Sequence, residues 1–397
     1  MMQSNSVRLV LSFWACVLLV SCGGGGGGGS EPVQAPPSPE YVYKTPDDIG
    51  DGWQVASLTD EGMDEETITL MMRRVLGGLF EGIDSVAIAR NSKLVLFVQI
   101  RDATGQFDDW VLNTDPERHV LHSTSKSFTS ALIGIAVDQG FIASVQVPFY
   151  DLFNYGAYGN WDPRKATMTL EDALTMRLGI AWDEWSLPYT NPLNDLVRLE
   201  NTNTDWAKAL LDLPMTSDPG TVYAYNTAAT IAIGQALENA TGIPMEDFAN
   251  QYLFFPMQID SAAWWKSPTG LPVGGSGLFL KTRDMLKFGQ LFIDDGVWKS
   301  QQLISPAWIA TSVARHVDVS SWATYSSAYG YQWWIDDLTY KTGSTEAWVT
   351  SGYGGQYIFA VPEADLVVAF TGHNYEHGER IADLYAMMES YVLHAID

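Results

Sequence analysis

The residues with the clearest chemical potential stand together in one short segment, His122-Ser123-Thr124-Ser125-Lys126. Residues three apart on a helix share a face, with Cβ atoms roughly 5–6 Å apart, so the Ser123 hydroxyl and the Lys126 amine can meet. A serine hydroxyl needs a neighbouring base to become a nucleophile, and an amine against a helix N-terminus loses basicity. The pair therefore predicts nucleophilic catalysis by Ser123 with Lys126 as its base. A capping serine beside a solvated lysine is the alternative.

A helix is needed to hold this pair, and the residues that follow predict one. Apolar side chains recur at helical spacing after Lys126, and Gly140 supplies a C-terminal stop. The apolar positions are Phe128, Leu132, Ile133, Ile135, Ala136 and Val137. We expect Ser123 in the first turn of this helix.

A second segment brings two tyrosines to the start of another predicted helix. Pro219-Gly220 predicts a turn, and the short extended piece behind it delivers Tyr223 and Tyr225. A phenol beside a lysine can carry protons, because the ammonium favours the phenolate. The alternative is that both tyrosines are ordinary half-buried loop aromatics.

A third segment, residues 350–357, places Gly352 and Gly354 beside a predicted strand. Glycines in a strand permit close approach by another backbone or a ligand. A strand edge that passes the Ser123 hydroxyl could offer a backbone N–H to a developing oxyanion. The alternative is a glycine-rich hairpin without catalytic meaning.

The remaining periodicities predict the elements around these segments. We expect helices at 67–80 after a cap at Asp64, after the capping residues Thr169–Asp172, at 206–211 after Asp205, at 227–241 before Gly242, at 281–294 and at 381–392. We expect strands at 85–90, 93–100, 329–335, 348–350, 357–361 and 366–371. This order predicts an α/β layer built from about residues 41–144 and 273–397, interrupted by a helical region of about residues 145–272.

The N-terminal segment predicts export rather than fold. Arg8 precedes an apolar run that is too short to span a bilayer, and the run closes on Ser21-Cys22, which resembles a bacterial lipoprotein signal. We expect a signal at residues 1–21, lipid on Cys22, and a Gly/Pro-rich tether at 22–40. The expected location is the membrane, on the periplasmic face of the outer membrane, and an ordinary secretory signal is the alternative.

The net charge argues against polyanionic partners, and the spacing of the histidines argues against a bound metal. The formal net charge of −25 argues against nucleic acid or anionic lipid headgroups. Among the six histidines, His119, His122, His373 and His377 lie near the segments of interest, but none follows a known metal-ligand spacing. We therefore expect structural or solvated histidines, with no metal and no cofactor.

The three segments together resemble the serine β-lactamase-like superfamily, which includes class C β-lactamases, penicillin-binding proteins, family VIII esterases and 6-aminohexanoate-dimer hydrolases. The order matches: Ser-Thr-Ser-Lys at 123–126, Pro-Gly-Thr-x-x-x-Tyr at 219–225, then a glycine-bearing strand. The resemblance extends to residues 174–184, 275–278, 282–289 and 354–363, and these look closest to the esterase and 6-aminohexanoate-dimer hydrolase branch.

The resemblance implies a fold and a set of roles. The fold would be α/β (α+β), with an antiparallel sheet flanked by helices and an all-helical insert. Ser123 would be the acylated nucleophile, Lys126 its base partner and Tyr225 a proton relay. The backbone amides of Ser123 and Tyr353 would form the oxyanion hole. Gly352, Gly354 and Thr227 would contact substrate. Apart from the resemblance, Trp182 and Trp185 could supply an apolar wall for an acyl chain, with a place in the core as the alternative.

Two departures from the β-lactamase pattern weigh against a penicillin substrate. Thr227 stands where many lactamases have the asparagine of Tyr-x-Asn. No Lys-Thr-Gly box occupies the strand that leads into Tyr357, where Thr350-Ser351-Gly352 stands instead. A literal Lys341-Thr342-Gly343 occurs earlier, and we interpret it as a hairpin, with a role as the strand box as the alternative.

The sequence therefore predicts a serine hydrolase that cleaves an ester or a small amide through an acyl-enzyme on Ser123. A β-lactamase or D-Ala-D-Ala carboxypeptidase is the first alternative. The second is a catalytically silent binding lipoprotein, which would not need Ser123, Lys126 and Tyr225 together. The sequence does not determine the natural substrate or the oligomeric state.

Overall fold

The structure is a computed structural model that describes residues 40–102, 115 and 117–396. The predicted signal at 1–21 and nearly all of the tether at 22–40, including Cys22, lie outside the described residues. No helix in the described ranges is long and apolar enough to cross a membrane.

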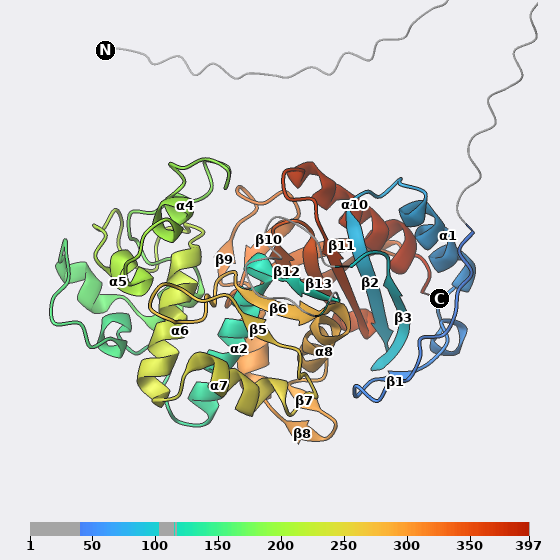
Figure 1. Cartoon of the computed structure of the whole chain (residues 1–397), viewed down its shortest axis with the longest axis horizontal. Coiled ribbons are helices and arrows are strands. Elements are labelled where there is room, and N and C mark those ends of the chain that lie inside the picture. The colour runs from blue at the N-terminus through green and yellow to red at the C-terminus, as the bar shows by residue number, and fades with distance from the viewer. Residues whose placement is uncertain (1–39, 103–114, 116, 397) are drawn as a thin grey trace, which may run out of the picture. The chain divides into compact units, whose positions relative to one another are not determined.

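A nine-stranded sheet dominates the described part of the chain, in the order β1-β3-β2-β14-β13-β12-β11-β10-β9 (Figure 1). All neighbours pair antiparallel except β1 with β3. Its strands are β1 (Gln54–Val55), β2 (Ile83–Arg90), β3 (Lys93–Gln99), β9 (Val317–Asp318), β10 (Ser326–Tyr329), β11 (Trp334–Tyr340), β12 (Gly343–Gly352), β13 (Gln356–Val361) and β14 (Leu366–Gly372). The first and last parts of the chain thus meet where β2 pairs with β14, as the sequence predicts.

Helices cover both faces of this sheet because its central strands are apolar on both sides. In β2, Ala87 belongs to the core on one face and Val86 to the core on the other. Helix α8 (Thr282–Ile293) packs on β2, β13 and β14, and it approaches closely at Gly289, where a Cβ atom would lie 2.4 Å from a methyl group of Val367. Helix α1 (Glu65–Leu76) and the C-terminal helices α10 (Ile381–Met387) and η9 (Met388–Val392) contribute to the core on the other face.

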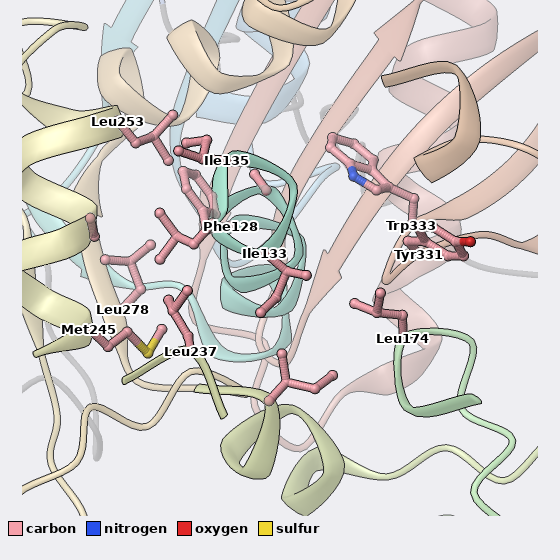
Figure 2. Close-up of a cluster of buried hydrophobic side chains, with 14 of the residues drawn as sticks. Phe128, Ile133, Ile135, Leu174, Leu237, Met245, Leu253, Leu278, Tyr331 and Trp333 are labelled. Atoms are coloured by element: carbon pink, nitrogen blue, oxygen red, sulfur yellow. The ribbon is translucent and has the colours of Figure 1, made fainter. Parts of the chain in front are cut away.

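Helix α2 (Ser125–Asp138) runs through the larger core and carries the lysine of the candidate pair. Its residues are buried from Ser125 to Ala136, and Phe128 stacks on Phe288 of α8 at 3.7 Å between ring centroids. Figure 2 shows apolar side chains from α2 and from the elements around it filling this core. Gly140 has a positive φ of 77°, which confirms the predicted stop.

The helical region between α2 and β5 (Ala263–Trp264) lies beside the sheet in Figure 1, and the short strand β4 (Arg118–Val120) precedes α2. Its α-helices are α3 (Leu170–Leu174), α4 (Asp195–Glu200), α5 (Trp206–Leu211), α6 (Thr227–Thr241) and α7 (Met245–Ala249). The predicted caps are present: Thr169 and Asp172 form a capping box, and Asp205 caps α5. Helix α6 has the predicted bounds, between its Asn226 cap and Gly242 in the left-handed conformation.

Two small sheets and one short helix complete the strands and α-helices of the described ranges. Strand β6 (Leu278–Lys281) pairs with β4 and β5, and β7 (Val297–Trp298) pairs with β8 (Gln301–Gln302). Helix α9 (Pro306–Ser312) starts at a Ser305 cap and packs its Trp308 over Gly134 of α2.

One predicted strand is wrong. Residues 329–335 do not form a single strand, because β10 ends at Tyr329 and β11 begins at Trp334. The residues between them turn, with Gln332 at a φ of 64°. Aromatic residues in an apolar run are typical of strands. Here Tyr331 and Trp333 are buried in the core around α2, and the chain turns between them at Gln332.

Candidate active site

Ser123 lies in a 3₁₀ turn, η3 (His122–Thr124), immediately before α2. The turn follows β4, and the Leu121 N–H donates to the Leu278 carbonyl oxygen, which ties the turn to β6. The sequence predicts Ser123 inside the first helical turn. The structure places it just before the helix, where the three-residue period of a 3₁₀ turn still brings Ser123 over Lys126.

Lys126 is almost fully buried and its amine has three hydrogen-bond acceptors. Its Nζ donates to Ser123 Oγ at 3.0 Å, to Thr227 Oγ1 at 2.9 Å and to the Gly275 carbonyl oxygen at 2.8 Å. Burial lowers the pKa of Lys126 to about 8, while the carboxylates of Glu184 and Glu200 act in the opposite direction. The sequence suggests that the helix terminus lowers the basicity of Lys126, whereas in the structure desolvation is the larger cause.

Thr227 connects the lysine to a buried carboxylate that the sequence did not reveal. Its Oγ1 donates to Glu184 Oε1 at 2.7 Å, and its backbone N–H donates to Glu184 Oε2 at 2.7 Å. Glu184 also accepts from Trp182 Nε1 at 2.8 Å and from the Tyr189 hydroxyl at 3.1 Å. Lys126, Thr227 and Glu184 therefore form one continuous polar chain beneath Ser123.

Tyr225 contacts both Ser123 and Lys126. Its side chain is hydrogen-bonded to Ser123, and its ring centroid lies 4.8 Å from the Lys126 ammonium. Burial raises the pKa of Tyr225, and Glu184 raises it further. The sequence suggests that the ammonium favours a phenolate, whereas in the structure burial and Glu184 favour the protonated phenol. Its partner Tyr223 is structural and packs on Tyr329 in the core.

The end of β12 runs against the turn that carries Ser123, as the predicted glycine positions require. A Cβ atom on Gly352 would lie 2.2 Å from the Leu121 carbonyl oxygen. Thr124 Oγ1 donates to the Gln356 carbonyl oxygen at 2.7 Å and lies 3.1 Å from Thr350 Oγ1, which fastens the turn to β12 and β13. Gly354 has a φ of 88°, which favours glycine.

Two small cavities open at Ser123. One, of about 140 Å³, is lined by Ser123, Tyr225 and residues 351–355, so it includes Tyr353 and Gly354. The other, of about 80 Å³, is lined by Ser123, Thr227, Tyr353 and the carboxylate-bearing Glu200. Ser123 and Tyr353 thus stand at the boundary between both cavities.

Glu200 is a second acidic residue near Ser123 that the sequence does not reveal. Burial raises the pKa of Glu200 to about 8, with a further increase from Glu184 and a decrease from Lys126. It is the last residue of α4, in a segment with ordinary helical composition. Its approach to Ser123 depends on tertiary packing, and no spacing in the sequence signals it.

Of the two tryptophans expected to form an apolar wall, one lies at Ser123 and the other does not. Trp182 is not among the residues that line the two cavities; it donates to Glu184 and lines a separate surface cavity instead. Trp185 takes the expected place as the apolar wall, packed on Tyr225 at 5.4 Å between ring centroids.

Lys341 lies in the predicted hairpin. Tyr340 pairs with Gly343, so Lys341 and Thr342 form a two-residue turn, with Lys341 at a φ of 51°. The ten residues of β12 separate this turn from the end that reaches Ser123. At ~3.3 Å per residue, the separation is about 30 Å. The structure therefore excludes Lys341 from the strand-box position.

The histidines near the site pack against aromatic or acidic groups. His122 contacts the rings of Tyr353 and Tyr375, and His373 Nδ1 lies 2.7 Å from Asp84 Oδ1. In the described ranges, no three His, Cys, Asp or Glu side chains gather in a way that could hold a metal ion.

Comparison with known proteins gives a consistent result. The family model described as Beta-lactamase matches residues 71–391. The 6-aminohexanoate-dimer hydrolase of Paenarthrobacter ureafaciens is 24% identical over 270 residues, which cover 64% of this chain and 65% of that protein. The match thus spans slightly less than two thirds of that relative.

Solved structures show the same fold at low identity. EstCE1, a hydrolase with promiscuous acyltransferase activity, superposes with a TM-score of 0.62 at 14% identity, covering 83% of this chain and 99% of that one. The penicillin binding protein from Bacillus halodurans superposes with a TM-score of 0.58 at 16% identity, covering 81% and 99% of the two chains.

Proposed function

The chain belongs to the beta-lactamase family, and from this premise we propose that it is a serine hydrolase that cleaves an ester or a small amide through an acyl-enzyme on Ser123. The family and its hydrolase relatives support an enzyme of this fold. The observation that carries the finer proposal is the 3.0 Å hydrogen bond from a buried Lys126 amine with a lowered pKa to the Ser123 hydroxyl.

In the proposed acylation step, Ser123 Oγ attacks the substrate carbonyl carbon and its proton passes to neutral Lys126. The Oγ–C bond forms as the carbonyl π-bond becomes an oxyanion, for which the backbone N–H groups of Ser123 and Tyr353 are the proposed donors. Collapse breaks the bond to the leaving group, and the protonated Lys126, directly or through the Tyr225 hydroxyl, returns the proton to that group. Water then attacks the acyl ester on Ser123 and passes a proton to neutral Lys126. Collapse of this second intermediate breaks the bond to Ser123 Oγ, which takes the proton back, and releases the acid.

We further propose that amides or esters with a nearby ammonium group are preferred. Glu200 lines the 80 Å³ cavity next to Ser123, and its burial disfavours the carboxylate. A substrate ammonium in this cavity would restore the carboxylate by direct charge pairing. The relative from Paenarthrobacter ureafaciens is named for a substrate built from an amino acid, which agrees with this preference.

A penicillin substrate is the less favoured alternative. The lactamase strand lysine has no counterpart at the Ser123 end of β12, where Thr350 is buried and hydrogen-bonded to the Ile358 N–H. Losing a charge-assisted contact typically costs about 1.5–3 kcal/mol, or roughly one to two decades in rate. Short activated esters need none of these contacts.

The test compares short p-nitrophenyl esters with a chromogenic cephalosporin on one preparation. We expect measurable kcat/KM for the esters, weak or absent cephalosporin turnover, and labelling by a fluorophosphonate probe. Ser123→Ala should fold normally and lose both ester turnover and labelling. Ser125→Ala, a neighbouring hydroxyl that does not line the cavities, is the matched control. Full activity in Ser123→Ala would overturn the assignment, and a tenfold advantage for the cephalosporin would favour the alternative.

We also propose that the enzyme is exported and held at a bacterial membrane by lipid on Cys22, on the periplasmic face of the outer membrane. The support is the sequence alone: an apolar run that ends at Ser21-Cys22, followed by seven glycines.

A further inference from the structure

An aromatic groove leads away from the candidate active site, and it is not used by the chemistry described above. A cavity of about 370 Å³ shares Trp185, Trp334 and Tyr357 with the cavity at Ser123. Beyond these residues it continues along Trp322, Tyr325 and Tyr385. These six side chains define the aromatic groove, which is continuous with the nucleophile at one end.

The groove is built from segments that are far apart in the sequence. Trp185 comes from the loop before α4, Trp322 and Tyr325 from the loop between β9 and β10, and Tyr385 from α10. Trp334 and Tyr357 lie on β11 and β13 and form its buried floor. No periodicity in one segment could have revealed this surface.

Three of its six aromatic side chains are exposed to a degree that a role in the core does not explain. Trp185 and Trp322 are 51% and 48% exposed, and Tyr325 is 37% exposed. Tyr325 stacks on Tyr385 at 3.9 Å between ring centroids, which fixes one wall. Large exposed aromatic rings that line a concave surface mark a binding site more often than single exposed apolar residues do.

Charge in the groove points to a neutral ligand group. Glu379 is its charged lining residue, and this side chain is 71% exposed and pairs with His377 at 3.1 Å, so the charge stays at the rim. The polar groups deeper in the groove are hydroxyls, and Ser351 Oγ already donates to the Tyr357 hydroxyl. Aromatic rings attract one another more strongly than equal areas of aliphatic surface.

We propose that the aromatic groove binds a planar, uncharged aromatic group of the substrate, attached on one side of the bond that Ser123 attacks. This inference rests on the proposed hydrolase function and names its substrate class. The aromatic group occupies the groove, while the opposite side of the scissile bond faces the smaller cavity of Glu200.

Two matched ester pairs test this inference, and the acyl-side pair keeps methanol as the leaving group. Benzyl acetate and cyclohexylmethyl acetate place a flat or a puckered ring on the alcohol side, and methyl phenylacetate and methyl cyclohexylacetate do so on the acyl side. In one of the two pairs, we expect the ester with the aromatic ring to have a kcat/KM about tenfold higher than its cyclohexyl partner. This ratio equals about 1.4 kcal/mol. Acid release is followed by titration at constant pH.

Variants at Trp322 separate the groove from the catalytic groups, since Trp322 does not line the cavity at Ser123. Trp322→Ala should remove most of the aromatic preference through KM and leave ethyl acetate turnover unchanged. Trp322→Phe should restore much of the preference. Trp161→Ala is the matched control, because Trp161 is 52% exposed and packs on Tyr150 and Tyr158, outside the groove.

Two results would overturn the inference: equal rates within both pairs, or a preference that survives in Trp322→Ala. A second measurement keeps it separate from the proposed function. Benzyl acetate and methyl phenylacetate are titrated into the Ser123→Ala protein by calorimetry, with and without Trp322→Ala. Binding that requires Trp322, without ester turnover by the native enzyme, would sustain the groove and refute the hydrolase. Turnover of all four esters without aromatic preference would support the hydrolase and refute the groove.

Discussion

Lys126 has a proton affinity set by two opposing effects. Desolvation disfavours its ammonium and lowers its pKa to about 8, and the nearby carboxylates of Glu184 and Glu200 favour the ammonium. A base must be neutral to accept the Ser123 proton, so the fraction of neutral Lys126 controls the proposed acylation. Activity should therefore rise with pH through a midpoint of about 8.

Glu184→Gln should move this midpoint to lower pH. The substitution removes the carboxylate whose charge raises the pKa of Lys126 most, so the amine becomes neutral at lower pH. The measurement is kcat/KM for a short ester between pH 5 and 10. The amide cannot accept all the hydrogen bonds of the carboxylate, so we also expect a lower plateau by about tenfold, at ~1.4 kcal/mol per decade.

Glu200→Gln is the matched control for this charge effect. Glu200 raises the pKa of Lys126 less than Glu184 does, and it does not take part in the hydrogen bonds of Thr227. We expect a smaller shift of the midpoint in the same direction. An unchanged pH profile in both variants would show that Lys126 is not the titrating base.

At the scale of elements, the site depends on how closely β12 approaches the turn that carries Ser123. Glycine at 352 leaves room for the Leu121 carbonyl oxygen, and the hydrogen bonds of Thr124 hold the turn against the sheet. The separation between Ser123 and the strand edge is therefore fixed by backbone packing. Such a separation matters because oxyanion donors act only at hydrogen-bond distance.

Gly352→Ala should lower kcat by tenfold or more while most of the fold persists. Its Cβ atom would lie 2.2 Å from the Leu121 carbonyl oxygen, so the strand end and the turn must separate. Gly343→Ala at the opposite end of β12 is the control, because its Cβ atom would meet nothing within 4 Å. Ester kinetics and thermal melting distinguish the two, and equal activity in both variants would contradict this role for Gly352.

At the scale of the whole molecule, the sheet buries polar groups as well as apolar ones. Asp336 of β11 is fully buried, and burial raises its pKa to about 7. The Tyr385 hydroxyl donates to its Oδ2, and the interactions with Tyr385 and Ser326 lower this pKa less than burial raises it. The folded protein therefore holds a proton on Asp336 at pH values where the unfolded chain has lost it.

This linkage predicts that stability falls as the pH rises from about 4 to about 7 at this residue. The folded state binds more protons than the unfolded state in that window, so the free energy of unfolding decreases with pH. Asp336→Asn should reduce this downward slope in denaturant titrations at successive pH values. Asp337→Asn is the control, because Asp337 is partly exposed and its pKa is lowered. An identical slope in native protein and Asp336→Asn would refute the prediction.

The N-terminal segment makes a separate prediction at this scale. Cys22→Ser should release the protein from bacterial membranes or block its processing, because a serine cannot carry the thioether-linked lipid. Membrane fractionation and the N-terminal mass of the full-length protein check the result. Cys16→Ser is the matched control and should leave both unchanged. Unaltered fractionation of Cys22→Ser would exclude the proposed anchor.

Local features of the sequence determined much of the fold. The caps at Asp64, Thr169 and Asp205 and the stops at Gly140 and Gly242 act through their own neighbours, so helix positions follow from short segments. The Ser123–Lys126 pair was predictable for the same reason, since three residues of chain fix its separation.

Only the tertiary structure decided which distant residues meet this pair. Glu184 and Glu200 come from a segment whose composition signals nothing, and packing brings them to Lys126. Trp182 and Trp185 are close in sequence, yet the chain turns one toward Glu184 and the other toward Tyr225. Lys341 matched a motif but stands at the far end of a ten-residue strand. Local chain geometry sets spacing over a few residues, whereas the proximity of distant segments follows from the burial of the whole core.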